Sequence, residues 1–452
     1  MSAAQFGRLT DPPASLLLRG VRLIDPNDGT DGQRDIAIVD GFIGEPGLLP
    51  AEAERIDASR LVAAPGFCDL HTHLREPGDE GAETIGSGAR AAARGGFTTV
   101  CAMPNTEPPL DGPARISWVI AQAREAACRV RVFGAVSADR SGESLAGLAA
   151  MADAGAVAFS DDGAALPSPS LARAALTYLR GLGIPLVEHA EDPRLAAGGV
   201  MRAGPTASRL GLSGWPPSAE LTIVERDIAL AAETGARLHL THLSTAAALD
   251  AVRRARARGL PVTCDVTPHH LALTDAWVAG SRRFAWEEDA DDRALDPDRA
   301  YDGRCRVNPP LGSREDAIAL QEGLADGTVD AIATDHAPHP TNRKLVPFDD
   351  AAPGLIGLET ALSVGLAAVA AGRVEMATLV AVLSIRPAEI IGERRSLAFG
   401  EPADLVVFDP AARWRVDSSA LASASANTPL LGMELPGVVR MTVADGRVTY
   451  RA

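Results

Sequence analysis

Short apolar segments recur along the chain, and each is followed by a stretch whose apolar residues repeat at helical spacing. The eight apolar segments are residues 66–73, 97–104, 130–136, 156–162, 184–190, 237–243, 260–270 and 329–338. Amphipathic stretches such as TIGSGARAAARGG and SAELTIVERDIALAAETG lie between them. Several end in glycine directly before the next strand, which is a helix-stop signal. Eight strand-then-helix units predict an α/β fold, a (β/α)8 barrel.

The two ends of the chain follow a different pattern. Residues 16–48 and 403–450 have the alternation of β-hairpins and no helical period. Neither piece has enough strands to be stable alone. We therefore expect one small β-sandwich beside the barrel, with residues 1–60 and 396–452 in the sandwich and residues 61–395 in the barrel.

An acidic run, residues 287–302, interrupts the barrel pattern after the seventh strand. Its composition is typical of a solvated loop. A lid over a site is the alternative.

Composition narrows the classes of partner that the protein can bind. The net charge of −16 argues against nucleic acid or an anionic membrane, and 4% aromatic residues leave few rings for stacking on bases. The chain has no continuous apolar run of membrane-spanning length and no signal-peptide pattern at its start. Its five cysteines form no CxxC pair, which is typical of reduced thiols. We expect a cytoplasmic protein that acts on a small molecule.

The segment GFCDLHTHLREPG, residues 66–78, carries an unusual set of polar side chains. Alternation in a strand would place Asp69, His71, His73 and Arg75 on one face. Two imidazoles at this spacing can hold one metal ion, although an HxH pair alone is a weak signal.

Further candidate ligands end other strands of the predicted barrel. His189 ends the fifth strand, His242 the sixth and Asp335 the eighth. His239, at an odd offset from His242, is expected to face the other way. The carboxyl ends of barrel strands meet at the face where active sites are built, and imidazoles and carboxylates are ligands of zinc and similar ions. The joint pattern predicts a metal centre.

The number of candidate ligands exceeds what one catalytic zinc needs, which is about three ligands and a water. Two ions would use them all but require an anionic bridge. The fourth strand offers Asp161 and Asp162. Val157 and Phe159 alternate with Asp161 and belong against the helices, so Asp162 is the better candidate, and Asp161 stays open if the strand is bulged.

The motifs now resemble a known family. DLHTHLREPG, AMPNTEPP, AFSDDG, EHAED, THLST, TPHHL, VNPPLG, ATDHAPH and GLIGLET occur in this order over roughly residues 60–400. Together they resemble the class I dihydroorotases of the cyclic amidohydrolase superfamily. The resemblance implies a distorted TIM-type barrel with a flanking β-sandwich. It also implies reversible metal-dependent hydrolysis of dihydroorotate to carbamoyl aspartate, a step of pyrimidine (UMP) biosynthesis.

The resemblance also implies residue roles. The metal ligands are His71, His73 and Asp335 for one zinc ion and His189 and His242 for the other, with Asp162 and a hydroxide as bridges. The substrate contacts are Arg75 and Asn105 for the carboxylate, Asn308 and His339 beside the ring, and the backbone of Pro353 and Gly354. Asp335 is the expected catalytic base and then acid. Pro353 has no N–H, so a contact there must use its carbonyl or the backbone of Gly354. Asp69 is expected to orient a histidine, and His269 and His270 to have supporting or structural roles.

Two other functions are weighed. Hydantoinases and allantoinases place a carboxylated lysine at the bridge, and AVAFSDDG contains no lysine. A dihydroorotase-like scaffold partner of aspartate transcarbamoylase typically lacks several metal ligands, whereas all six are present here. The sequence leaves open whether cobalt or manganese replaces zinc, whether the chain is a homodimer, and whether it associates with aspartate transcarbamoylase as well as catalysing.

Overall fold

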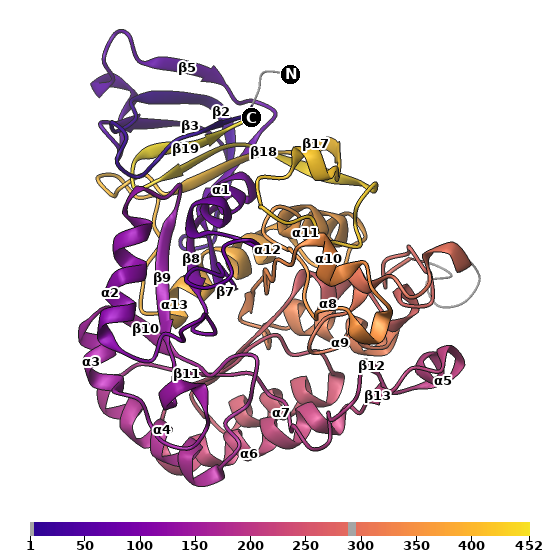
Figure 1. Ribbon diagram of the computed structural model, residues 1–452. Coiled ribbons are helices and arrows are strands. Elements are labelled where there is room, and N and C mark those ends of the chain that lie inside the picture. Colours follow the sequence, from indigo (N-terminus) through magenta and orange to yellow (C-terminus); the bar gives the residue numbers. More distant parts are fainter. Residues whose placement is uncertain (1–3, 288–294) are drawn as a thin grey trace.

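Eight parallel strands form the barrel (Figure 1). They are β7 (Phe67–Thr72), β8 (Phe97–Ala102), β9 (Arg129–Gly134), β10 (Ala156–Phe159), β11 (Leu186–Glu188), β14 (Leu238–Leu240), β15 (Val262–Val266) and β16 (Ala331–Ile332). They pair in chain order, and a parallel bridge between Thr72 and His336 returns the eighth unit to the first. Seven of these strands lie within the segments expected from the sequence and β9 begins one residue before its segment, so the barrel prediction is confirmed.

The computed structural model describes residues 4–287 and 295–452. The acidic run at residues 287–302 raised the question of a loop or a lid, and its residues 288–294 lie outside the described residues. None of the described helices combines the length and apolarity needed to cross a bilayer.

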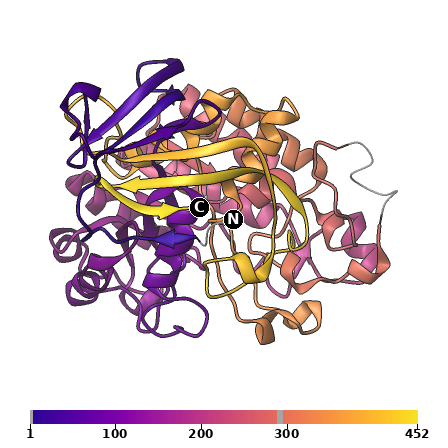
Figure 2. The same ribbon diagram turned by 90° about the horizontal axis from the view of Figure 1, so that it is seen from above.

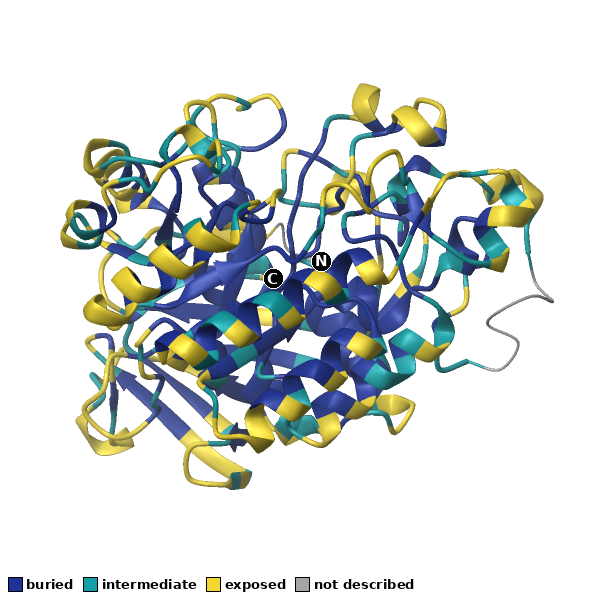
Figure 3. Cartoon of the chain, turned by 90° about the horizontal axis from the view of Figure 1, so that it is seen from below, coloured by how far each residue is buried: buried dark blue, intermediate teal, exposed yellow. Residues whose placement is uncertain are grey.

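Helices surround the barrel with their apolar faces inward, and Figure 3 shows exposed residues along their outer faces. The longer ones are α1 (Ile85–Gly95), α2 (Pro113–Gln122), α4 (Pro169–Leu182), α6 (Ser218–Thr234), α7 (Ala246–Ala257), α9 (Arg314–Ala325) and α11 (Ala361–Ala370). Shorter ones are α3 (Leu148–Asp153), α5 (Pro205–Leu210), α8 (Pro268–Ala272), α10 (Thr341–Lys344), α12 (Met376–Leu383) and α13 (Ile385–Ile390). Gly96, Gly183 and Gly235 end α1, α4 and α6 in the left-handed conformation, as the glycine signals predicted.

The inside of the barrel is packed with apolar side chains on the side that helix α13 covers. Cys68 and Leu70 of β7, Cys101 of β8, Phe133 of β9 and Val187 of β11 belong to one buried cluster. A cluster with members from so many strands can only lie inside the barrel. Ile390 of α13 belongs to it as well, so this helix closes that end.

Both chain ends contribute to one flanking sheet, and Figure 2 shows their strands side by side. Its strands are β1 (Gln5–Phe6), β2 (Leu16–Asp25), β3 (Thr30–Val39), β4 (Phe42–Gly44), β5 (Glu54–Asp57), β6 (Val62–Pro65), β17 (Leu405–Arg415), β18 (Glu434–Ala444) and β19 (Arg447–Arg451). Strand β6 pairs with both β2 and β17 and so joins the two ends. A two-stranded pair, β12 (Met201–Arg202) and β13 (Gly214–Trp215), lies apart.

The flanking β-rich unit built from both ends is therefore confirmed. Its nine strands are hydrogen-bonded into one continuous sheet, which encloses its own apolar core including Leu18, Ile38, Leu405 and Val443. The boundaries drawn at residues 60/61 and 395/396 stay a prediction; β6, which begins at Val62, pairs within the flanking sheet.

Candidate active site

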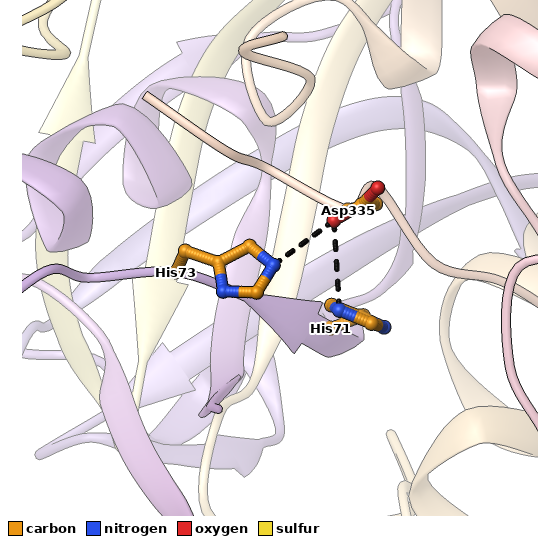
Figure 4. Close-up of side chains that lie close together, drawn as sticks. All are labelled: His71, His73 and Asp335. Atoms are coloured by element: carbon orange, nitrogen blue, oxygen red, sulfur yellow. Dashed lines mark hydrogen bonds and ion pairs between the residues drawn. The ribbon is translucent and has the colours of Figure 1, made fainter. Parts of the chain in front are cut away.

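All six residues proposed as metal ligands meet at the carboxyl ends of the barrel strands. His71 and His73 come from the end of β7, and Asp162, His189, His242 and Asp335 follow β10, β11, β14 and β16. All six are buried. Asp335 Oδ1 lies 3.1 Å from Nε2 of His73 and 3.5 Å from Nε2 of His71 (Figure 4). These three side chains converge closely enough to share one ion.

Asp162 lies at the centre of the cluster. Its Oδ1 is 3.3 Å from His71 Nε2 and 3.5 Å from both His189 Nδ1 and His242 Nε2. Its Oδ2 is 3.6 Å from His73 Nε2. One carboxylate thus faces all four imidazoles, which is the position a bridging ligand requires.

The neighbouring Asp161 points elsewhere. Its carboxylate accepts hydrogen bonds from the backbone N–H groups of Val136 (2.8 Å) and Ser137 (3.1 Å) and from the Ser137 hydroxyl. Of the two aspartates that the sequence left open, the structure brings Asp162 to the histidines.

Positive backbone φ angles occur at three positions of the site. Arg75, His242 and Asp335 have φ values of 60°, 42° and 46°, in the left-handed region that residues other than glycine seldom adopt. Such conformations cost roughly 1–3 kcal/mol each and persist only where the surrounding structure imposes them. Each of these turns follows a strand and redirects the side chain that it carries.

The left-handed turn at His242 explains why the expectation that His239 faces away from the barrel interior was wrong. Leu238 and Leu240 pack in the core shared with the helices, so odd-numbered residues of β14 face the barrel interior. His239 is on that side, with Nε2 2.8 Å from Asp265 Oδ2. His242 has even parity and reaches the cluster because its left-handed backbone breaks the alternation.

Buried partners behind the cluster orient it, and sequence reasoning missed most of them. The Thr241 hydroxyl lies 2.8 Å from His71 Nδ1 and donates to Asp265 Oδ2 (3.0 Å), while Asp265 Oδ1 accepts from His242 N (2.7 Å). Asp69 accepts hydrogen bonds from the backbone N–H groups of His71 (3.1 Å) and Thr334 (2.9 Å). Asp69 thus holds the His71 backbone rather than an imidazole. The pairing of Thr241 with Asp265 across two strands has no signal in the local pattern.

Glu191 is a second missed partner. Its Oε2 accepts from His189 Nε2 at 2.8 Å and from Asn308 Nδ2 at 2.7 Å. A neutral His189 with its proton on Nε2 has a free lone pair on Nδ1, the atom that faces Asp162. The signal was in the EHAED motif, where Glu191 is two residues from His189.

The electrostatics of the cluster suit bound cations. Burial would lower the pKa of His71, but the Asp162 and Asp335 carboxylates outweigh it and raise that pKa to about 9. Burial would raise the pKa of Asp162, yet the neighbouring imidazoles, His71 first, hold it well below its ordinary value. His71 Nε2 and Asp162 Oδ1 are buried without a hydrogen-bond partner among the described residues. Four imidazoles and two carboxylates with such orphaned atoms are a donor set that fits zinc or a similar ion.

A cavity of about 240 Å³ opens beside the cluster. Its lining includes all six residues expected to contact substrate, namely Arg75, Asn105, Asn308, His339, Pro353 and Gly354. Arg75 Nε donates to the carbonyl of Pro338 at 3.2 Å, and no carboxylate of the described residues pairs with its guanidinium. An arginine that has no carboxylate partner and lies beside this cluster can hold an anionic group of a ligand.

The other candidates have clear positions. Asn105 Oδ1 lies 2.9 Å from His73 Nδ1, so Asn105 contacts a candidate ligand as well as the cavity. His270 is held on both ring nitrogens, by Thr267 Oγ1 (2.9 Å) and the Pro309 carbonyl (3.0 Å). His269 is buried outside the cavity lining. Neither of these two histidines joins the cluster.

Comparisons with known proteins show the family of the chain. A family model described as "Dihydro-orotase-like" matches residues 60–248. A dihydroorotase of Anaeromyxobacter sp. (strain K) is 47% identical over 440 residues, which is 96% of this chain and 98% of the relative. A dihydroorotase of Pelobacter propionicus is 43% identical over 97% of this chain and 100% of the relative. Among solved structures, an L-hydantoinase (dihydropyrimidinase) from Arthrobacter aurescens superposes with a TM-score of 0.80 at 26% identity, covering 96% of each chain. The chain belongs to the dihydroorotase family.

Proposed function

We propose that this chain is a dihydroorotase, which reversibly hydrolyses the cyclic amide of dihydroorotate to carbamoyl aspartate in pyrimidine biosynthesis. The observation that carries the proposal is the single cavity in which Arg75 lies beside the His/Asp cluster. Dihydroorotate combines the two features this cavity addresses, a carboxylate and a ring amide. Hydantoin lacks the carboxylate and would leave the Arg75 guanidinium in the cavity without an anionic partner.

The residues fit two divalent ions, and we propose zinc. His71, His73 and Asp335 would hold one ion, His189 and His242 the other, and Asp162 would join both. When bound, such ions would polarise a carbonyl and lower the pKa of a water molecule that they hold to about 7.

The protein's own groups then have distinct tasks. Arg75 and Asn105 hold the substrate carboxylate and orient the ring. Burial would raise the pKa of Asp335, but His71 and His73 hold it below its ordinary value, so the carboxylate is ionised and can act as a base. Asp335 takes a proton from the attacking water as the new C–O bond forms. It gives that proton to the ring nitrogen as the C–N bond breaks, and the reverse steps close the ring.

A substrate comparison tests the proposal. The purified protein, with its metal content measured, is assayed with dihydroorotate, hydantoin and allantoin. We expect turnover of dihydroorotate and at most weak turnover of the two substrates without its carboxylate. Preferred turnover of hydantoin or allantoin would contradict the proposal. A metal-loaded protein inactive toward all three would favour the scaffold alternative, although the complete set of six ligands argues against it.

Compartment and assembly belong to the proposal as well. All five cysteines are buried and unpaired, which supports a reducing, cytoplasmic location. A homodimer and an association with aspartate transcarbamoylase stay predictions. Light scattering of the chain alone and mixed with that transcarbamoylase would test both.

A further inference from the structure

Lys344 is the only lysine in the chain; the other 42 of its 43 basic residues are arginines. It ends the short helix α10 and is 2% exposed, although Arg343 before it and Leu345 after it are exposed. Lysine is seldom fully buried without a carboxylate partner. No carboxylate of the described residues forms an ion pair with Lys344. A buried cation that does not balance an anion requires another explanation.

Backbone carbonyls satisfy this ammonium. Lys344 Nζ donates to the carbonyl oxygens of Arg306 (3.1 Å), Ala352 (2.6 Å) and Gly354 (2.8 Å). An ammonium has three donors that converge from one point, which a planar guanidinium cannot reproduce. The carbonyls of Arg306 and Gly354 each have another donor, Gly354 N and Asn427 Nδ2. Lys344 is the only described donor to the carbonyl of Ala352.

The carbonyls that Lys344 holds belong to the wall of the active-site cavity, at Gly354, or to segments next to it. Pro353 and Gly354 line the cavity, and Asn308 lies two residues beyond Arg306. The carbonyls of Ala352 and Gly354 point to Lys344, whereas the intervening carbonyl of Pro353 accepts from His339 Nε2 at 2.9 Å. Gly354 has φ 127°, and a Cβ there would lie 2.6 Å from that of Ala337, so the segment is tightly placed.

The hydrogen bond to the Pro353 carbonyl decides which ring nitrogen of His339 carries the proton. Burial lowers the pKa of His339 to about 3, so its ring is neutral and carries one proton. That proton is on Nε2 when Nε2 donates to Pro353 (2.9 Å), a closer contact than the one between Nε2 and Arg75 Nη2 (3.4 Å). His339 Nδ1, which is buried and has no partner among the described residues, is then an acceptor.

We propose that Lys344 is a positioning residue for the substrate ring: its amino group fixes residues 352–354 so that the Pro353 carbonyl holds the His339 ring at the cavity wall. This inference rests on the proposed dihydroorotase function. Lys344 does not touch the cluster, and it acts only through the backbone of this wall.

The test compares Lys344→Met with Arg343→Met. Methionine keeps the length of the side chain and removes its donors. Arg343 is the exposed neighbour on the same helix and pairs with Asp79 at the surface (2.6 Å). We expect Lys344→Met to raise KM for dihydroorotate about tenfold, the equivalent of one lost hydrogen bond, with a smaller change in kcat and unchanged metal content. Arg343→Met should leave all three at wild-type values.

A measurement on the wild type covers the case in which Lys344→Met does not fold. Because there is one lysine, labelling with [15Nζ]lysine gives a single side-chain resonance. It should shift when an equilibrium mixture of dihydroorotate and carbamoyl aspartate is added. An unmoved resonance at saturating substrate, or an unchanged KM in folded Lys344→Met, would overturn the inference while leaving the function intact. A wild type unable to hydrolyse dihydroorotate would instead refute the proposed function, and this inference with it.

Discussion

The two ends of the barrel differ sharply although the same strands build both. Toward the end that α13 covers, Cys68, Leu70 and Phe133 pack with Ile390 in an apolar cluster. At the carboxyl ends, four imidazoles and two carboxylates are buried together around a cavity. One end is stabilised by burial of apolar surface, whereas the other contains charged groups whose burial costs free energy unless they are paired. The comparison indicates that the apolar end supports a rim that is itself arranged for chemistry.

The largest effect on activity should come from a change in the cluster at the carboxyl ends of the barrel strands. Asp335→Asn removes the proposed base, so we expect kcat in both directions to fall by about 10²–10⁴-fold. The melting temperature should change little, since asparagine keeps the size of the side chain. Steady-state assays and thermal denaturation measure the two. The exposed Asp326→Asn is the control, and near wild-type turnover in Asp335→Asn would show that Asp335 is not the base.

The opposite pattern should follow a change at the apolar end. Phe133→Ala leaves a cavity inside the barrel, and the free energy of unfolding should drop by about 3–5 kcal/mol. Metal content and KM of the remaining folded protein should be close to wild type. Phe399→Ala is the matched control, because Phe399 is 67% exposed. A Phe133 variant that lost metal without losing stability would break the division between the two ends.

A smaller effect on the metal site should come from changing a residue that contacts a candidate metal ligand. Thr241→Val removes the hydroxyl bonded to His71 Nδ1, and we expect metal affinity to fall by about 10–100-fold. Competition with a chelator measures it. Thr263→Val on the next strand is the control, since the Thr263 hydroxyl contacts His239, outside the cluster (2.8 Å). Equal affinities in the two variants would show that the Thr241 contact does not tune the site.

A last effect, spread over several pH units, concerns the cavity wall. Burial lowers the pKa of Lys344 from 10.5 to about 7; Cys305 and Asp302 oppose this shift, and Arg306 and Arg304 add to it. Between pH 7 and 10.5 the unfolded chain therefore binds more protons at this residue than the folded chain, so its contribution to stability rises with pH. Denaturant unfolding across this range should show the free energy of unfolding of wild type rising relative to that of Lys344→Met. A constant difference would mean that the ammonium keeps its ordinary pKa in the fold.

Much of the architecture was predictable because its signals are local. Strand-then-helix periodicity with glycine stops identified the barrel, and hairpin alternation identified the flanking unit. The candidate ligands were identified by type and by their place at strand ends. Alternation also favoured Asp162 over Asp161, and the structure places Asp162 against the histidines.

The same alternation failed where the backbone leaves the strand conformation. His239 was expected to face away from the interior, but the left-handed turn at His242 reverses the parity. A sequence pattern has no signal for that turn, since histidine seldom adopts it and only the surrounding structure imposes it. Partners from distant segments were equally hidden. Asn427, near the C-terminus, donates to the carbonyls of Ala337 (3.0 Å) and Gly354 (3.1 Å) beside the cavity.

The sequence by itself determined the succession of strands and helices, the pairing of the two chain ends in one β unit, and the chemical types available at the rim. These follow from periodicity and residue chemistry, which are properties of short segments. Only the tertiary structure decided which nitrogen of each histidine faces a carboxylate, which hydroxyl and carboxyl groups stand behind them, and that the single lysine lies behind the cavity wall. Those outcomes depend on contacts between residues tens to hundreds of positions apart, and on backbone turns that are stable only inside the complete barrel.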